Sequence, residues 1–367
     1  MTTQFATTGS AQGLGDGSSE ANRIELKKAI EDDAGLAVAL AAGDEIVCKN
    51  DGELTYDGSG SEFAVPAISG TNALPITVAG YTTTPGDGGS IVIRDTNAGA
   101  TNNHINFGSI DFWAFKNMSI LDCRIAFNML TSSGHYFDNI KVRNNQGIAF
   151  LRGTALAPGC TYVRCFVFDG VSAYEDNGLG SRWVNCVAIN GSGVGFANSP
   201  SANPGSFTNC LAAFMSNDGY VLSRGTTLIN CTSHRNQDGF TFIFSGGPNV
   251  MINCAATSNS GFGINALLAS TIHTVNCALA ASNELNTSGE SSANATLLKS
   301  GEVTSDPIYV DGNPATKTDV NLTVGNTWRE AGIGLHIDVI TKSFIDLGVA
   351  QQVNRDTLII KRTKRIM

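Results

Sequence analysis

Charged residues are scarce in this sequence, and the marks of several common protein classes are missing. Lys, Arg, Asp and Glu make up 15% of its 367 residues, whereas glycine occurs 41 times. That composition suits an all-β protein with many tight turns better than a helical one. No apolar run is long enough to cross a membrane, and the start, Met1-Thr2-Thr3-Gln4-Phe5, lacks the basic and apolar parts of a secretory signal. We therefore expect synthesis in a cytoplasm and no membrane partner.

The charge balance has the wrong sign for a protein that grips nucleic acid. The formal net charge is −9, so nucleic acid is not expected as a partner of the body of the chain. The C-terminal tail, residues 352–367, is the exception and reads as a docking segment for an acidic partner. Its basic residues are Arg355, Lys361, Arg362, Lys364 and Arg365.

The nine cysteines lack the spacing of a metal site or of a disulfide framework. Zinc sites use cysteines a few residues apart, and the sequence has no C-x-x-C pair. Disulfides between neighbouring repeats would leave one cysteine over, and this usage fits a reducing compartment. We expect neither a bound metal nor another cofactor.

The dipeptide Asn-Cys recurs at regular spacing between Trp183 and Cys277. The units are Asn185-Cys186, Asn209-Cys210, Asn230-Cys231, Asn253-Cys254 and Asn276-Cys277. Successive cysteines are 24, 21, 23 and 23 residues apart, and Cys165 extends the series by 21. Each Asn follows a β-branched residue, and most units precede a Gly-aromatic pair such as Gly195-Phe196. A repeat of this length without helical periodicity predicts a solenoid of stacked β-coils.

Each position of the repeat has a physical interpretation. Asn tolerates the left-handed α region that a sharp bend requires, and its amide can bond to the Asn of the next coil. The β-branched residue before the bend and the Cys after it are both expected to face the interior. Ile252→Asp is accordingly expected to abolish folding of the central coils, because it would bury a charge.

The ends of the chain differ from the repeat. Residues 1–17 read as an extended arm or docking segment, and their glycines lack the Lys-Ser/Thr ending of a phosphate-binding loop. Residues 18–42 are expected to form a capping helix that begins near Glu20, with Ser18 or Ser19 as its N-cap. The β-helix is predicted over residues 43–351.

Several segments resemble pectate-lyase-like right-handed parallel β-helices. The capping helix followed by Ala42-Gly43-Asp44-Glu45-Ile46-Val47 is similar to the opening of that family, and the run from Pro75 to Gly89 is similar to coils found in tailed-bacteriophage proteins. Ser305-Asp306-Pro307-Ile308 and Phe344-Ile345-Asp346-Leu347-Gly348 resemble closing coils of the same proteins. The resemblance implies an all-β, single-stranded right-handed parallel β-helix with a short N-terminal capping helix.

The resemblance does not extend to the family's catalytic motifs. The sequence has no Gly-His-Gly, and its only Asp-Asp pair, Asp32-Asp33, falls in the predicted capping helix. The best remaining set lies on neighbouring coils: Glu175, Asp176, Arg182, Asp218, Arg224, His234, Arg235 and Asp238. Asp218 and Asp238 each precede a Gly-aromatic pair, so they are expected to stack, either as turn residues or as a pair that holds a proton or an ion. His234 is read as a solvated surface residue or a weak catalytic candidate.

Two functions fit these observations. The first is a non-catalytic structural protein of a tailed-phage virion, a capsid decoration or spike that forms a homotrimer and contacts other virion proteins. The second is a glycan-binding or glycan-depolymerising tailspike, in which Tyr174, Trp183, Phe196, Tyr220 and Phe240 would stack on sugars in a groove along the coils. Host-surface glycan is the partner of this second function.

Overall fold

The described part of the chain is an all-β parallel β-helix with one short helix. The computed structural model describes residues 2–31, 39–56, 63–65, 67–96, 103–153, 158–198, 205–245, 248–279, 293 and 295–300. The chain divides into two compact units, Met1–Leu335 and His336–Met367, and all described residues belong to the first. The predicted fold class is confirmed. Residues 301–351 of the predicted β-helix and the basic tail lie outside the described residues.

The described strands form a large sheet of 20 strands and a small sheet of nine, and every pairing is parallel. The strands of the large sheet are β1 (Thr3–Thr7), β2 (Ile24–Glu25), β3 (Glu45–Lys49), β4 (Glu53–Tyr56), β6 (Ile76–Tyr81), β7 (Ile91–Asp95), β9 (Trp113–Leu121), β11 (Tyr136–Arg143), β13 (Thr161–Val163), β14 (Phe166–Phe168), β16 (Arg182–Val184), β17 (Val187–Ile189), β19 (Ser206–Thr208), β20 (Leu211–Ala213), β22 (Thr227–Ile229), β23 (Thr232–His234), β25 (Pro248–Ile252), β26 (Ala255–Thr257), β28 (Ser270–Val275) and β29 (Ala295–Ser300). The strands of the small sheet are β5 (Phe63–Ala64), β8 (Asn103–Asn106), β10 (Ile125–Asn128), β12 (Ile148–Arg152), β15 (Ser172–Asp176), β18 (Phe196–Asn198), β21 (Tyr220–Leu222), β24 (Phe240–Phe242) and β27 (Ile264–Ala266).

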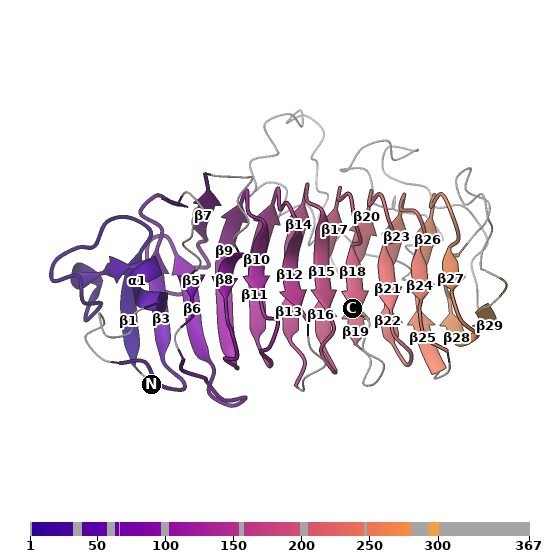
Figure 1. The fold of residues 1–367 in the computed structure, drawn as a ribbon, viewed down its shortest axis with the longest axis horizontal. Helices are drawn as coiled ribbons and strands as arrows, with labels where there is room; N and C mark the ends of the chain where they lie inside the picture. Colours follow the sequence, from indigo (N-terminus) through magenta and orange to yellow (C-terminus); the bar gives the residue numbers. More distant parts are fainter. Residues whose placement is uncertain are drawn as a thin grey trace, which may run out of the picture. The chain divides into compact units, whose positions relative to one another are not determined.

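One regular coil consists of three short strands separated by bends. In the coil that contains β16, β17 and β18, the first two strands join the large sheet and the third joins the small sheet. Trp183 of β16 pairs with Phe207 of β19, and Phe196 of β18 pairs with Tyr220 of β21, so the next coil repeats the first in register. Figure 1 shows the strands of successive coils side by side along this unit.

Aromatic rings fill the interior as two columns. The column on the small sheet contains Phe127, Phe150, Tyr174, Phe196, Tyr220 and Phe240, with ring centroids 4.7–5.1 Å apart. The column on the large sheet contains Phe115, Phe137, Tyr162, Trp183 and Phe207. The spacings on the small sheet follow the ~4.8 Å separation of neighbouring strands, so strand register stacks these rings. Burial of each ring contributes roughly 1.5–3 kcal/mol.

The bend between the two strands of the large sheet carries a column of asparagines. Their φ angles lie between 50° and 56°, in the left-handed region. The side-chain amide of Asn209 donates to Asn185 (3.1 Å), that of Asn230 to Asn209 (3.0 Å) and that of Asn253 to Asn230 (3.1 Å). The column begins earlier than the Asn-Cys units, since Asn139 donates to Asn117 (2.9 Å).

The cysteines after this bend form a buried column of free thiols. Cys165, Cys186, Cys210, Cys231, Cys254 and Cys277 are all buried. Each Sγ donates to the carbonyl two residues earlier, at 3.4–3.5 Å. Burial raises the pKa of the Cys165, Cys210 and Cys254 thiols, so they stay protonated. The column serves packing.

The residue before each bend faces outward, which corrects the expectation that it lies inside. Val184, Ile229 and Ile252 are partly exposed, whereas the residue before each of them is buried. In β25, Met251 is 0% exposed and points inward. The error came from counting alternation through the bend, because an asparagine in the left-handed region redirects the chain and resets which side chains point inward. The reason given for expecting Ile252→Asp to abolish folding is therefore wrong, because the substitution would not bury a charge.

A second column of left-handed residues follows the next strand, and the repeat motif gave no sign of it. Its members are Asp122, Asn144, Asp169, Asn190, Phe214, Arg235 and Ser258, with φ between 53° and 61°. Asn144 donates to Asp122 (2.8 Å) and Asn190 to Asp169 (2.5 Å), as in the first column. From Phe214 onward the residue types change, so no constant dipeptide marks the position in the sequence.

Arg164 interrupts the asparagine column, and its replacement by Asn tests the column. Arg164 has φ 50° and makes two hydrogen bonds to Asp138, at 2.9 and 2.7 Å. Arg164→Asn should change the free energy of unfolding by no more than about 0.5 kcal/mol, because Asn favours this φ and an exposed ion pair contributes little. Arg164→Ala should be about 1 kcal/mol less stable than Arg164→Asn, because Ala lacks the tolerance of Asn for this φ. Urea unfolding measures both, and equal losses would contradict the role given to Asn.

The N-terminal segment belongs to the β-helix, which corrects its description as an arm. Thr3–Thr7 forms β1 and pairs along its length with β3, and Ile24–Glu25 pairs with the other side of β1. The predicted capping helix is also shorter. A 3-10 turn spans Glu20–Asn22 without a side-chain cap from Ser19, and α1 spans Leu26–Glu31. Strand pairing takes residues 24–25, so the helix begins after them. Residues 32–38, which include Asp32-Asp33, lie outside the described residues.

Candidate functional site

Asp218 and Asp238 occupy equivalent positions on neighbouring coils, immediately before β21 and β24. The Gly219 amide donates to the Asp238 carbonyl (2.9 Å), which fixes the two turns one above the other. The Asp238 side chain is 7% exposed. Its carboxylate accepts from the Phe262 amide (2.6 Å) and from the Asn265 side chain (2.7 Å). Asp238 therefore holds the turn of the following coil in place.

Asp218 is the less engaged of the two carboxyls. Its pKa is raised chiefly by burial, the nearby Thr241 hydroxyl opposes the rise, and the negative charge of Asp238 adds to it. A carboxyl with a raised pKa beside a second carboxylate can hold a proton that an isolated Asp would lose. This is the one chemical property that the candidate pair offers.

Asp218→Asn should stabilise the protein at neutral pH and leave it unchanged in acid. Because folding raises this pKa, the contribution of Asp218 is fully present below the ordinary Asp pKa and is lost as the pH rises through the folded value. We expect a gain of about 0.5 kcal/mol at about pH 7 and none at about pH 3, a small figure because the group is partly solvated. Thermal unfolding at both pH values measures it. A loss of stability at pH 7 would contradict the assignment.

His234 is buried, which corrects its interpretation as a solvated surface residue. The side chain is 0% exposed in β23, and its Nδ1 lies 2.8 Å from the Thr257 hydroxyl. Burial, aided by the charge of Arg235, lowers the pKa of His234 to about 3. The imidazole stays neutral at physiological pH and has no surface from which to exchange protons with a substrate.

The other sequence candidates do not meet at one place. Asp176 is 0% exposed and forms part of the interior, while Arg182 is exposed at the start of β16 in the large sheet. Arg224 is exposed after β21. The aromatic residues proposed to stack on sugars, from Tyr174 to Phe240, are all 0% exposed members of the interior columns. They cannot contact a glycan in the folded protein.

A buried ion pair inside the coils was not foreseen from the sequence. Arg152 and Asp176 are both 0% exposed, and Nη1 of Arg152 lies 3.3 Å from Oδ1 of Asp176. Tyr162 donates its hydroxyl hydrogen to Asp176 (2.8 Å), and Arg152 also donates to the carbonyls of Ser132 and Pro158. Register could have suggested it, because Arg152 and Asp176 end paired strands β12 and β15.

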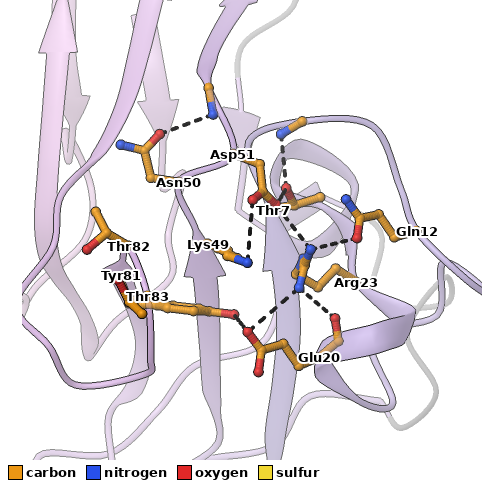
Figure 2. Close-up of polar contacts among 12 residues, drawn as sticks. Thr7, Gln12, Glu20, Arg23, Lys49, Asn50, Asp51, Tyr81, Thr82 and Thr83 are labelled. Atoms are coloured by element: carbon orange, nitrogen blue, oxygen red, sulfur yellow. Dashed lines mark hydrogen bonds and ion pairs between the residues drawn. The ribbon is translucent and has the colours of Figure 1, made fainter.

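A second polar cluster fastens the N-terminal segment to the first coils (Figure 2). Arg23 donates to the side chain of Gln12 (2.6 Å) and lies 3.3 Å from a carboxylate oxygen of Asp51. Thr7 also donates to Asp51 (2.7 Å). Tyr81 donates to Glu20 (3.3 Å), and burial together with that carboxylate raises the pKa of Tyr81 to about 12. The phenol stays protonated and does not act as a base. The cluster instead holds the N-terminal segment against the first coils.

An open hollow lies over the turns that follow β20, β23 and β26. Its volume is 350 Å³. Buried Met215 and Asn236 form its floor, and Ser216, Arg235, Gln237, Ser258 and Ser260 complete its lining. None of these residues is acidic. Sequence reasoning named only Arg235, because serines and glutamines in turns have no distinctive spacing.

Within the described ranges, no three His, Cys, Asp or Glu side chains are arranged so that they could hold a metal ion. In the same ranges, none of the helices has the length and apolar character needed to span a membrane.

No protein-family model and no curated protein sequence matches the chain. Among solved structures it is similar to pectate lyase Pel9A, with a TM-score of 0.59 and 16% identity over 89% of this chain and 90% of the other. It is also similar to a rhamnogalacturonan lyase, with a TM-score of 0.51 and 16% identity over 76% of this chain and 75% of the other. The chain has a pectate-lyase-like β-helix fold. At this identity the likeness concerns fold alone, since one scaffold serves many activities.

Proposed function

We propose that the chain is a structural protein of a tailed-bacteriophage virion, a capsid decoration or spike that works without catalysis. The observation that supports this most is the use of the candidate catalytic side chains by the fold itself. His234 is buried against Thr257, and the Asp238 carboxylate bonds to Phe262 and Asn265. The resemblance of the Pro75–Gly89 run and of the closing segments to phage β-helix proteins supports a virion location.

The proposed partners follow from that role. The chain would form a homotrimer and contact other capsid or tail proteins. The basic residues of the tail, from Arg355 to Arg365, would supply a docking contact with an acidic surface. These residues lie outside the described part of the chain.

The virion assignment is tested by fractionation of purified particles. Mass spectrometry of virions from the source phage should find this polypeptide in a fixed ratio to the major capsid or tail protein. Its absence from purified particles, with abundant polypeptide in the infected-cell lysate, would remove the assignment.

A glycan-active tailspike is the second candidate, and the Asp218–Asp238 pair favours it. The raised pKa of Asp218 beside a second carboxylate is a property that acid catalysis on sugars uses. The two solved structures described above are named as polysaccharide lyases. A screen of host polysaccharides for new reducing ends or unsaturated products tests this candidate. Activity that Asp218→Asn abolishes would establish it, and no turnover on any polymer would leave the structural role.

A further inference from the structure

The hollow over the turns after β20, β23 and β26 presents polar groups that the fold does not use. Among the described residues, the hydroxyls of Ser216 and Ser258 and the amide of Gln237 make no hydrogen bond to the protein. The three groups come from three successive coils. Ser216 and Gln237 are exposed and Ser258 is half-buried, so a ligand in the hollow can reach all three groups.

In contrast, backbone amides in the hollow already donate hydrogen bonds to the protein. The amides of Ser216, Gln237 and Ser260 donate to the carbonyls of the preceding coil at 2.8–3.0 Å. A ligand would therefore meet side chains and not a nest of free backbone N–H groups. Because the buried amide of Asn236 bonds to Ala212 and Ser233, the floor of the hollow is also fixed.

Arg235 gives the hollow a positive charge in a chain whose net charge is −9. It stands in the second left-handed column, where earlier coils carry Asp122, Asp169 and asparagines. Its guanidinium lies 5.9 Å from the centroid of the Phe214 ring, within the range of a cation–π attraction. In the coil that lines the hollow, the second left-handed column therefore carries the cation Arg235, where earlier coils carry Asp122 and Asp169.

We propose that this hollow binds a sugar residue that carries a sulfate or phosphate ester. Guanidinium and hydroxyl donors that reach in from three coils match the several acceptor oxygens of a tetrahedral oxyanion. The volume of 350 Å³ falls in the range of small-molecule sites and leaves space for a sugar ring beside the anion. The inference holds wherever the protein is located and does not rest on the proposed virion role.

Arg235→Asn is the decisive variant, and Arg164→Asn is its matched control. Both replace an arginine at a left-handed bend by the residue that best tolerates that backbone, and Arg164 lies on the other bend column. Binding of the full chain to dextran sulfate and to uncharged dextran is measured by calorimetry at fixed salt. We expect binding to dextran sulfate only, weakened about tenfold by Arg235→Asn and unchanged by Arg164→Asn.

Both variants retain the basic tail, so its contribution to binding is the same in each and cancels when their affinities are compared. Equal affinities for the wild type and Arg235→Asn, or equal losses in both variants, would overturn the proposal, because binding would then follow overall charge. Ser216→Ala with Ser258→Ala should weaken binding about threefold without changing charge.

Competition identifies the form of the ligand. A sulfated monosaccharide should displace dextran sulfate at lower concentration than inorganic sulfate or phosphate does. Equal displacement by the free anions would overturn the assignment of a sugar to the hollow.

Discussion

Met251→Asp is expected to unfold the central coils, whereas Ile252→Asp, one residue further along the same strand, is expected to be tolerated. Met251 is fully buried between Leu228 and Thr274 of the neighbouring coils. The substitution places a charge in the interior and removes a large apolar side chain, for a loss of about 5 kcal/mol or more. Ile252 faces outward, and its replacement should cost about 1 kcal/mol.

Circular dichroism during thermal unfolding compares the two variants under one set of conditions. Loss of the β-sheet signal at room temperature is the expected result for Met251→Asp, with a cooperative transition retained by Ile252→Asp. The reverse order would show that the inward and outward faces of β25 have been exchanged.

The second large effect is expected from Asp176→Asn. This change keeps the shape of the side chain but leaves the buried charge of Arg152 without a counterion, at a cost of about 3–5 kcal/mol. Asp138→Asn provides the control, because it breaks the pair with Arg164, whose side chain is 54% exposed, and should cost less than about 1 kcal/mol.

A double-mutant cycle separates the ion pair from its surroundings. Arg152→Gln combined with Asp176→Asn should lose less stability than the sum of the single changes, because neither charge remains unpaired. Urea unfolding of the four proteins gives the coupling free energy. Additive losses would indicate that hydrogen bonds to Ser132, Pro158 and Tyr162 stabilise the region and that the charges do not.

The coils could be predicted from the sequence because two residue types recur where the backbone leaves no choice. Asn stands at a bend that most residues avoid, and Cys fits a narrow interior position, so both appear at each coil from Asn185 to Cys277. The pairs Gly195-Phe196, Gly219-Tyr220 and Gly239-Phe240 mark the start of β18, β21 and β24, whereas Gly263-Ile264 takes that place at β27. Constraints of this kind make the same residue types recur at regular intervals in the sequence.

The candidate site could be predicted only in part, because its positions carry no such constraint. Asp218 and Asp238 lie in register, as expected, but the hydrogen bonds of the Asp238 carboxylate depend on Phe262 and Asn265, more than twenty residues away. His234 was misplaced because Ala213 and Thr257 occupy its position in the neighbouring coils, and small residues do not reveal whether a position is covered. The hollow arises from turns whose residue types vary freely.

The asparagine column also makes the chain divisible. The segment between Asn209 and Asn230 is one complete lap of the solenoid, that is, one coil. Its excision would bring Asn230 against Asn185 with every inward column still continuous. Recombination can therefore shorten or lengthen such a gene by whole laps without a new interior having to evolve. Variation in the number of laps, with the two ends kept, is the form of divergence that this architecture permits most readily.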